Sequence, residues 1–135
     1  MNKKTIQGTA LVYADKAFNT PNGKTAHGLV RFTERFEVLG VIDQTYAGQD
    51  AGYVLDGKAN GIPVFKNLPS ALETVKPKNF VIGLAPDGGR LPSEARDTIK
   101  LAIENGMDII SGLHDFISKD ESIVSLAKKH GRTIK

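Results

Sequence analysis

The chain has 135 residues, of which 40% are hydrophobic and 24% are charged, proportions that exclude a disordered chain and are typical of one domain with its own core. It contains no cysteine, which excludes disulfides and thiolate metal sites. The net charge is +3, and the 18 basic residues are interspersed with 15 acidic ones and form no basic stripe with aromatic residues, so nucleic acid is not the expected partner.

The first quarter of the chain predicts a strand followed by a helix. An apolar run at residues 10–14 suits a strand but is too short for the hydrophobic part of a signal peptide after the basic residues 1–4. No apolar run is long enough to span a membrane, and we expect a cytoplasmic protein. Asn22 is the expected N-cap of the helix. Gly28 lies inside this helix, where we expect it to mark close packing against a strand.

The next part of the chain predicts two strands separated by a long loop. A largely apolar segment at residues 36–43 predicts the second strand, which ends on the acid Asp43. Four glycines within residues 44–61 predict a long loop with one helical turn. Residues 62–65 predict a short third strand. Pro63 places that strand at a sheet edge, because proline cannot donate a ladder hydrogen bond.

The second half of the chain is organised around residues 80–90. The first six of these residues form a continuous apolar run, which predicts a strand buried on both faces, and Pro-Asp-Gly-Gly then ends the strand. A segment with helical periodicity follows and stops at Gly106, and residues 108–112 predict another strand. Strand, glycine-rich turn, helix and strand form a βαβ unit, which binds ligands at the turn after its first strand.

Two capping boxes predict the remaining helices. Ser70 and Glu73 open a short helix before the central strand, and Ser118 and Glu121 open a last helix. Residues 133–135 then look like the start of a sixth strand.

The alternation of strands and helices predicts the fold class. We expect a three-layer α/β fold, with a Rossmann-like parallel sheet of five or six strands and helices on both faces. The expected strand order is 3-2-1-4-5, and residues 1–135 are expected to form this single Rossmann-like domain.

The turn after the first strand lacks both common phosphate-binding motifs. Its glycines come late and at the wrong spacing for a dinucleotide fingerprint. Asn-Gly-Lys-Thr resembles the end of a Walker A loop, but Phe18 stands where the first glycine of that motif belongs. Backbone N–H groups at a helix start still attract anions, so this stretch is a candidate ligand site. Its candidate residues are Asn22, Gly23, Lys24 and Thr25.

Two further turns carry candidate ligand residues. Asp43 stands where an acid in dinucleotide-binding folds binds a ribose hydroxyl. The alternative is that the acid only ends the strand where the chain meets water. In the turn after the central strand, Arg90 is a candidate clamp for a carboxylate or phosphate, and the alternative is a solvated arginine. The other candidates in that turn are Pro86, Asp87, Gly88 and Gly89, of which Asp87 has the alternative role of shaping the backbone.

His114 is the candidate for acid–base chemistry, because its pKa lies near neutrality and it follows the fifth strand, beside the glycine-rich turn. Asp115 is placed to orient it, and Gly112 belongs to the same candidate site. The alternative is a structural histidine, since no nucleophile accompanies it. No metal-ligand cluster has a plausible spacing in the sequence.

Four stretches, in this order along the chain, together resemble a known family. They are Lys24-Thr25-Ala26-His27-Gly28, Gly40-Val41-Ile42-Asp43, Gly83-Leu84-Ala85-Pro86-Asp87-Gly88-Gly89-Arg90-Leu91-Pro92 and Ser111-Gly112-Leu113-His114-Asp115-Phe116. They resemble the N-terminal Rossmann-like domain of a two-domain family that has long been catalogued as uncharacterised and includes D-glutamate N-acetyltransferase-like proteins. The resemblance implies a C-terminal P-loop NTPase-like domain as partner. We expect that domain to be absent here, since Lys135 falls about where it would be joined.

Two interpretations stay open, with a third behind them. In the first, the chain is the small-molecule-binding part of an N-acyltransferase-like enzyme of D-amino acid metabolism, inactive without its second domain. Its ligand would be a nucleotide, acetyl-CoA or an amino acid, and the implied cofactor is acetyl-CoA or ATP. In the second, it is a non-catalytic scaffold for homo-oligomerisation or for docking the P-loop domain. The third, an NAD-binding oxidoreductase domain, is disfavoured by the missing fingerprint.

The fold also predicts where a ligand would lie. Open parallel sheets bind ligands outside the carboxyl ends of their strands, at the crevice where the strand order reverses. We therefore expect a pocket between residues 22–25, 87–90 and 112–115.

Overall fold

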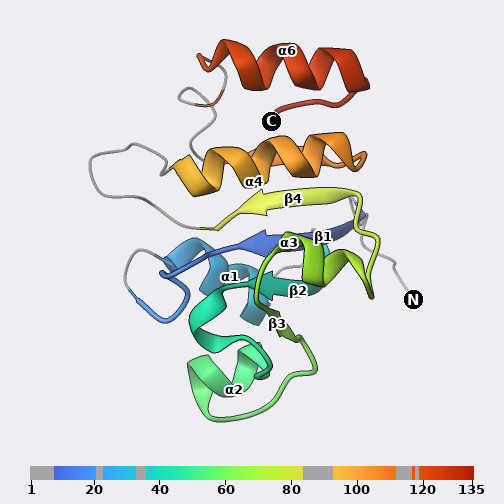
Figure 1. Cartoon of the computed structure of the whole chain (residues 1–135). Coiled ribbons are helices and arrows are strands. Elements are labelled where there is room, and N and C mark those ends of the chain that lie inside the picture. The colour runs from blue at the N-terminus through green and yellow to red at the C-terminus, as the bar shows by residue number, and fades with distance from the viewer. Residues whose placement is uncertain (1–7, 21–22, 33–35, 84–92, 112–116, 118) are drawn as a thin grey trace.

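A computed structural model describes residues 8–20, 23–32, 36–83, 93–111, 117 and 119–135. Five strands form one sheet in the order β3-β2-β1-β4-β5, and every neighbouring pair is parallel (Figure 1). The strands are β1 (Thr9–Tyr13), β2 (Glu37–Ile42), β3 (Val64–Phe65), β4 (Asn79–Ile82) and β5 (Asp108–Ser111). The predicted fold class and strand order are confirmed. The edge position of the third strand is confirmed as well.

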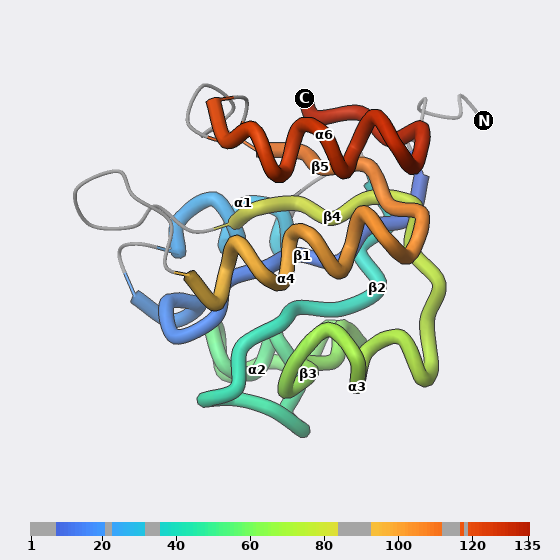
Figure 2. Tube along the Cα trace, turned by 45° about the horizontal axis from the view of Figure 1, so that its top comes forward, coloured from blue at the N-terminus to red at the C-terminus, as the bar shows by residue number. Residues whose placement is uncertain are grey.

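Helices cover both faces of the sheet. They are α1 (Lys24–Phe32), α2 (Ala51–Asp56), α3 (Leu68–Leu72), α4 (Ser93–Glu104) and α6 (Glu121–His130), with a short 3₁₀ helix, η2 (Gln44–Tyr46). Helices α1 and α2 lie on one face of the sheet, and α3, α4 and α6 lie on the other (Figures 1 and 2). Because all five strands are parallel, their carboxyl ends lie at the same edge of the sheet, which we call the carboxyl edge.

The alternating side chains of the central strands build two cores. Leu11 and Tyr13 of β1 pack with Phe80 of β4 on the face that carries α3, α4 and α6. Val12 packs on the opposite face, in a second cluster that includes Ala26 of α1. Both faces of β1 are buried, as the continuous apolar run predicts for a central parallel strand.

Several local predictions are corrected by the structure. The N-cap of α3 is Asn67, whose side chain accepts from the Ser70 amide, so Ser70 lies inside the helix. The N-cap of α6 is Asp120, and Ser118 lies outside the described residues. In both cases a neighbouring Asx side chain forms the cap expected of a serine. The predicted long loop at residues 44–61 contains η2 and α2.

Gly28 does not mark close packing. A Cβ at this position would meet no atom within 4 Å, so the predicted contact with a strand is wrong. The close approach between α1 and the sheet occurs at Gly83 instead. There a Cβ would lie 2.6 Å from Val12 Cγ1 and 3.0 Å from Ala26 Cβ.

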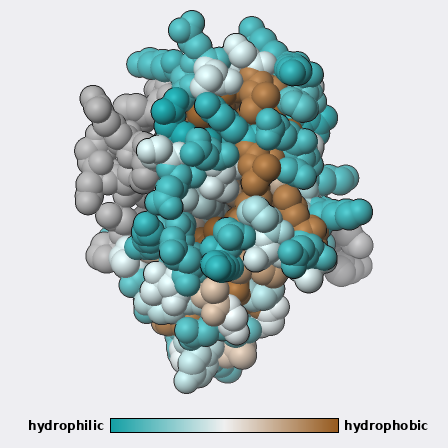
Figure 3. Space-filling model, viewed as in Figure 1, coloured by the Kyte–Doolittle hydropathy of each residue, from teal (hydrophilic) through white to brown (hydrophobic). Residues whose placement is uncertain are grey.

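The last residues extend the sheet, as predicted. Ile134 forms a parallel bridge with Ile109 of β5, and the Ser111 amide donates to the Lys135 carbonyl at 2.9 Å. Much of the surface in Figure 3 is polar, crossed by a narrow apolar strip. Tyr53 is the exposed large hydrophobic residue of the described part of the chain. Within that part, no helix combines the length and apolar character needed to cross a membrane.

Candidate functional site at the carboxyl edge

Asp43 fixes the loop that joins β1 to α1. It follows β2 directly and is 1% exposed. Its Oδ1 accepts from the amides of Lys16 at 3.1 Å and Thr45 at 2.9 Å, and its Oδ2 accepts from the Phe18 amide at 3.0 Å. Lys16 has a left-handed backbone conformation, with φ of 66°, which is uncommon outside glycine. The carboxylate therefore holds a folded loop, whose Phe18 side chain is buried in the core.

The start of α1 is packed closely against this loop and β4. A Cβ at Gly23 would lie 2.3 Å from the Ala17 carbonyl oxygen, so the position accepts only glycine without movement of the backbone. The Gly23 amide donates to the Thr20 carbonyl at 2.9 Å, and the Ala26 amide donates to the Gly83 carbonyl at 3.1 Å. Two amides that a phosphate would use are thus already bonded within the protein.

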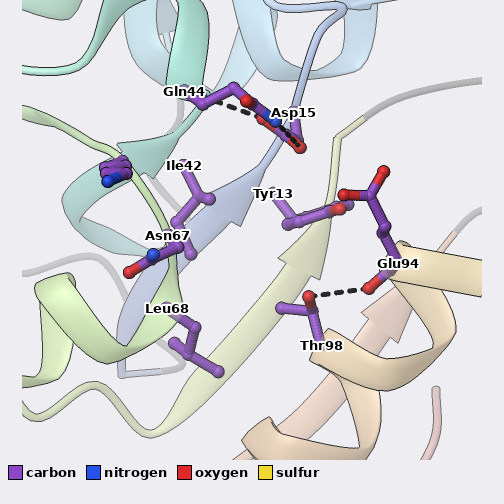
Figure 4. Close-up of a pocket in the computed structure, with 9 residues that line it drawn as sticks. Tyr13, Asp15, Ile42, Gln44, Asn67, Leu68, Glu94 and Thr98 are labelled. Atoms are coloured by element: carbon purple, nitrogen blue, oxygen red, sulfur yellow. Dashed lines mark hydrogen bonds between the residues drawn. The ribbon is translucent and has the colours of Figure 1, made fainter.

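A cavity of about 180 Å³ opens at the carboxyl ends of β1, β2 and β3 (Figure 4). We call it the edge cavity, and it is lined by Tyr13, Asp15, Ile42, Gln44, Lys66, Asn67, Leu68, Glu94 and Thr98. Ile42 and Leu68 are each 1% exposed and form its apolar base. The polar groups come from residues just after strands and from the first turns of α4, so the topology of the sheet assembles them.

Hydrogen bonds order the polar lining of the edge cavity. Asp15 accepts from the Gln44 amide at 2.9 Å and from its Nε2 at 3.1 Å. The Thr98 hydroxyl donates to the Glu94 carbonyl at 2.8 Å. In Figure 4 the Tyr13 side chain extends toward Glu94 and Thr98, and Asn67 lies on the opposite side of the cavity.

Burial, followed by the nearby carboxylates of Asp15, Glu94 and Asp43, raises the pKa of Tyr13 to about 12. Because the folded-state pKa lies above the ordinary value of 10.0, the stability from the neutral phenol is complete below pH 10. We expect it to be lost as the pH rises from 10.0 to about 12.

Titration of phenolate absorbance should therefore show one tyrosine of the 3 ionising well after the others. Tyr13→Phe is expected to remove this late phase and to leave the earlier ones. A late phase that survives in Tyr13→Phe would contradict the raised pKa of Tyr13.

Only part of the sequence-predicted site lies in the described residues. Gly23, Lys24 and Thr25 lie at the start of α1, whereas Asp43 lies beneath the preceding loop. The others lie outside the described residues, and their assignment stays a prediction: Asn22, Pro86, Asp87, Gly88, Gly89, Arg90, Gly112, His114 and Asp115.

Sequence reasoning missed the edge cavity, although a signal was present. Asp15, Gln44 and Lys66 each follow one of three strands that neighbour one another in the sheet. Residues just after parallel strands meet at one edge, so these positions could have been grouped once the strand order was predicted. Glu94 could not have been grouped with them, because its position depends on how α4 lies across the sheet.

A second hollow lies on the other face of the sheet. It has a volume of about 290 Å³, lies between α1 and strands β4 and β5, and is mainly apolar, with Leu29, Phe36, Val81 and Ile110 among its lining residues. Among the residues that the structure describes, no group of three or more His, Asp or Glu could hold a metal ion.

Comparison with known families decides the membership of the chain. Residues 44–135, more than half of the chain, match the Rossmann-like domain of unknown function DUF1611_N. The chain belongs to this family. A solved DUF1611 family protein from Anabaena variabilis resembles the DUF1611_N domain described above with a TM-score of 0.82 and 30% identity, and the match covers 95% of this chain and 36% of that one.

Curated relatives of this DUF1611_N domain carry an enzyme name. A D-glutamate N-acetyltransferase of a Pseudoalteromonas species is 46% identical over 57 residues. A D-glutamate N-acetyltransferase of Tritonibacter scottomollicae is 35% identical over 57 residues. Each match covers 42% of this chain and 17% of the relative, so the chain corresponds to a small part of those enzymes.

Proposed function

We propose that the chain is the small-molecule-binding Rossmann-like domain of a D-glutamate N-acetyltransferase-like protein, and that it is not catalytic alone. The observation that carries this proposal is the edge cavity, a polar hollow at the carboxyl ends of three parallel strands, where open α/β sheets bind ligands. The relatives named D-glutamate N-acetyltransferase support the enzyme class.

The contacts of the described residues favour some ligands over others. A dinucleotide places its pyrophosphate at the first helix and its ribose on the acid after the second strand. Here the amides of Gly23 and Ala26 donate to carbonyls, and both oxygens of Asp43 accept from backbone amides. These contacts disfavour NAD. They favour an amino acid, or a ligand such as acetyl-CoA or ATP that does not use these dinucleotide contacts.

Ligand binding tests the proposal. We expect D-glutamate, acetyl-CoA or ATP to shift amide resonances of the purified chain at Asp15, Gln44 and Glu94 in NMR titrations. We expect no acetyl-CoA-dependent acetylation of D-glutamate above background, because charge development in acyl transfer needs further positioned groups. NAD is the comparison ligand. Shifts confined to the amino ends of the strands, such as Glu37 and Lys78, would contradict the proposal, and so would turnover by this chain.

A scaffold is the second candidate function. The observation that favours it is the mainly apolar hollow between α1 and strands β4 and β5, which could receive another domain or a second copy of the chain. A dimer in light scattering, together with the absence of any ligand-induced shift at the carboxyl edge, would support the scaffold over ligand binding.

A further inference from the structure

The two sides of the edge cavity differ in charge. Asp15 and Glu94 supply carboxylates, and Figure 4 places them around the hydroxyl end of Tyr13. Asn67 lies across the cavity in the same view, and Lys66, its neighbour in the chain, also lines the cavity. A ligand with separated positive and negative groups would match this division.

Both carboxylates can accept a further hydrogen bond. Among the residues that the structure describes, Gln44 donates two hydrogen bonds to Asp15, and a carboxylate has room for about four. Glu94 pairs with Lys16 at 3.2 Å, with the two side chains 68% and 59% exposed respectively. Such an exposed ion pair contributes little stability, so a ligand ammonium can replace the lysine at low cost.

The opposite side offers donors. The Asn67 Oδ1 accepts from the Ser70 amide at 2.9 Å, which assigns the other end of its side chain, the Nδ2 group, to donation. Together with the Lys66 ammonium, this group suits a carboxylate.

The electrostatic field at the Tyr13 hydroxyl agrees with this division of charge between the two sides of the cavity. Three carboxylates act on its hydroxyl, which stays neutral at physiological pH, and they make this part of the cavity attractive to a cation. The same carboxylates oppose a phosphate or another anion at this place.

We propose that the edge cavity binds a small acidic α-amino acid, with the ammonium between Asp15 and Glu94 and the side-chain carboxylate toward Lys66 and Asn67. The cavity of about 180 Å³ suits this size, since a cavity of roughly 150 Å³ holds a benzene molecule. This inference rests on the proposed function and assigns the amino-acid substrate class, rather than acetyl-CoA or ATP, to this cavity.

NMR titration of the purified chain tests the assignment with three probes. D-glutamate carries an ammonium and a side-chain carboxylate, glutarate lacks the ammonium, and D-2-aminobutyrate lacks the side-chain carboxylate. We expect D-glutamate to bind at least about tenfold more tightly than either analogue, with shifts at Tyr13, Asp15 and Thr98. Glu94→Gln and Asp15→Asn should each weaken D-glutamate binding about tenfold while leaving glutarate binding unchanged. Glu104→Gln, the same change at an exposed position of α4, is the matched control and should bind like the parent chain.

Each other outcome overturns the inference in a distinguishable way. Equal binding of D-glutamate and glutarate would show that the ammonium is not recognised. D-glutamate binding that survives Glu94→Gln and Asp15→Asn would place the amino acid elsewhere. If acetyl-CoA or ATP binds at the carboxyl edge but D-glutamate does not bind at concentrations up to about 10 mM, the inference is overturned and the proposed function stands. If none of these ligands binds, both fail.

Discussion

Asp43→Asn is expected to lower the free energy of unfolding by about 2–4 kcal/mol. The side chain is buried and accepts from three backbone amides, at Lys16, Phe18 and Thr45. Asparagine retains one oxygen, so its amino group would face a backbone donor, and at least one buried N–H would lose its acceptor. Urea unfolding followed by circular dichroism measures the change.

Asp15→Asn is the comparison for this prediction. Asp15 also accepts from a backbone amide, that of Gln44, but at an exposed position where water can replace the lost interaction. We expect it to cost less than about 1 kcal/mol. Equal losses in the two variants would show that Asp43 does not anchor the loop. In Asp43→Asn, amide exchange in residues 16–18 should also become faster relative to the central strands, because Lys16 loses the contact that holds its left-handed conformation.

Gly23→Ala is expected to lower the free energy of unfolding by about 2–3 kcal/mol, even though alanine is the better helix former. The added methyl group would lie 2.3 Å from the Ala17 carbonyl oxygen and 2.7 Å from that of Phe18. Both are backbone atoms, so the loop or the start of α1 must move. The measurement is the midpoint and slope of urea unfolding.

Gly28→Ala, in the same helix, separates packing from helix propensity. Nothing lies within 4 Å of a Cβ at this position, so the methyl group meets no obstacle. We expect this variant to be more stable than the parent by about 0.5–1 kcal/mol, because alanine loses less conformational entropy than glycine in a helix. Destabilisation by Gly28→Ala, or a neutral Gly23→Ala, would contradict the packing described for α1.

The role of Asp43 changes how the Rossmann-like fold is used here. An acid at the end of the second strand binds a ribose in dinucleotide-binding members of this fold class. In this protein the loop after β1 folds over that position, and backbone amides occupy both carboxylate oxygens. The same position can thus serve the protein's own loop, which makes the neighbouring edge cavity the better candidate for a ligand.

The sequence by itself determined the architecture. Continuous apolar runs such as that at residues 80–82 indicate buried parallel strands, and the helical period of Ala95, Ile99 and Ile103 indicates the face that α4 buries. Because parallel strands need crossover helices, this alternation predicted the order 3-2-1-4-5. The motifs that resemble the D-glutamate N-acetyltransferase-like family pointed to the family that the comparisons show.

Only the tertiary structure decided the contacts between distant segments. Serine, asparagine and aspartate compete for a cap within a few residues, so Asn67 and Asp120 displaced the predicted serines. The sequence placed Asp43 at a strand end, but its partners depend on the path of a loop whose Phe18 is buried in the core. The edge cavity joins Tyr13, Asn67 and Glu94, which are separated by dozens of residues. No local sequence pattern predicts that these residues lie close together, because their proximity arises from the way α3 and α4 lie across the ends of the strands.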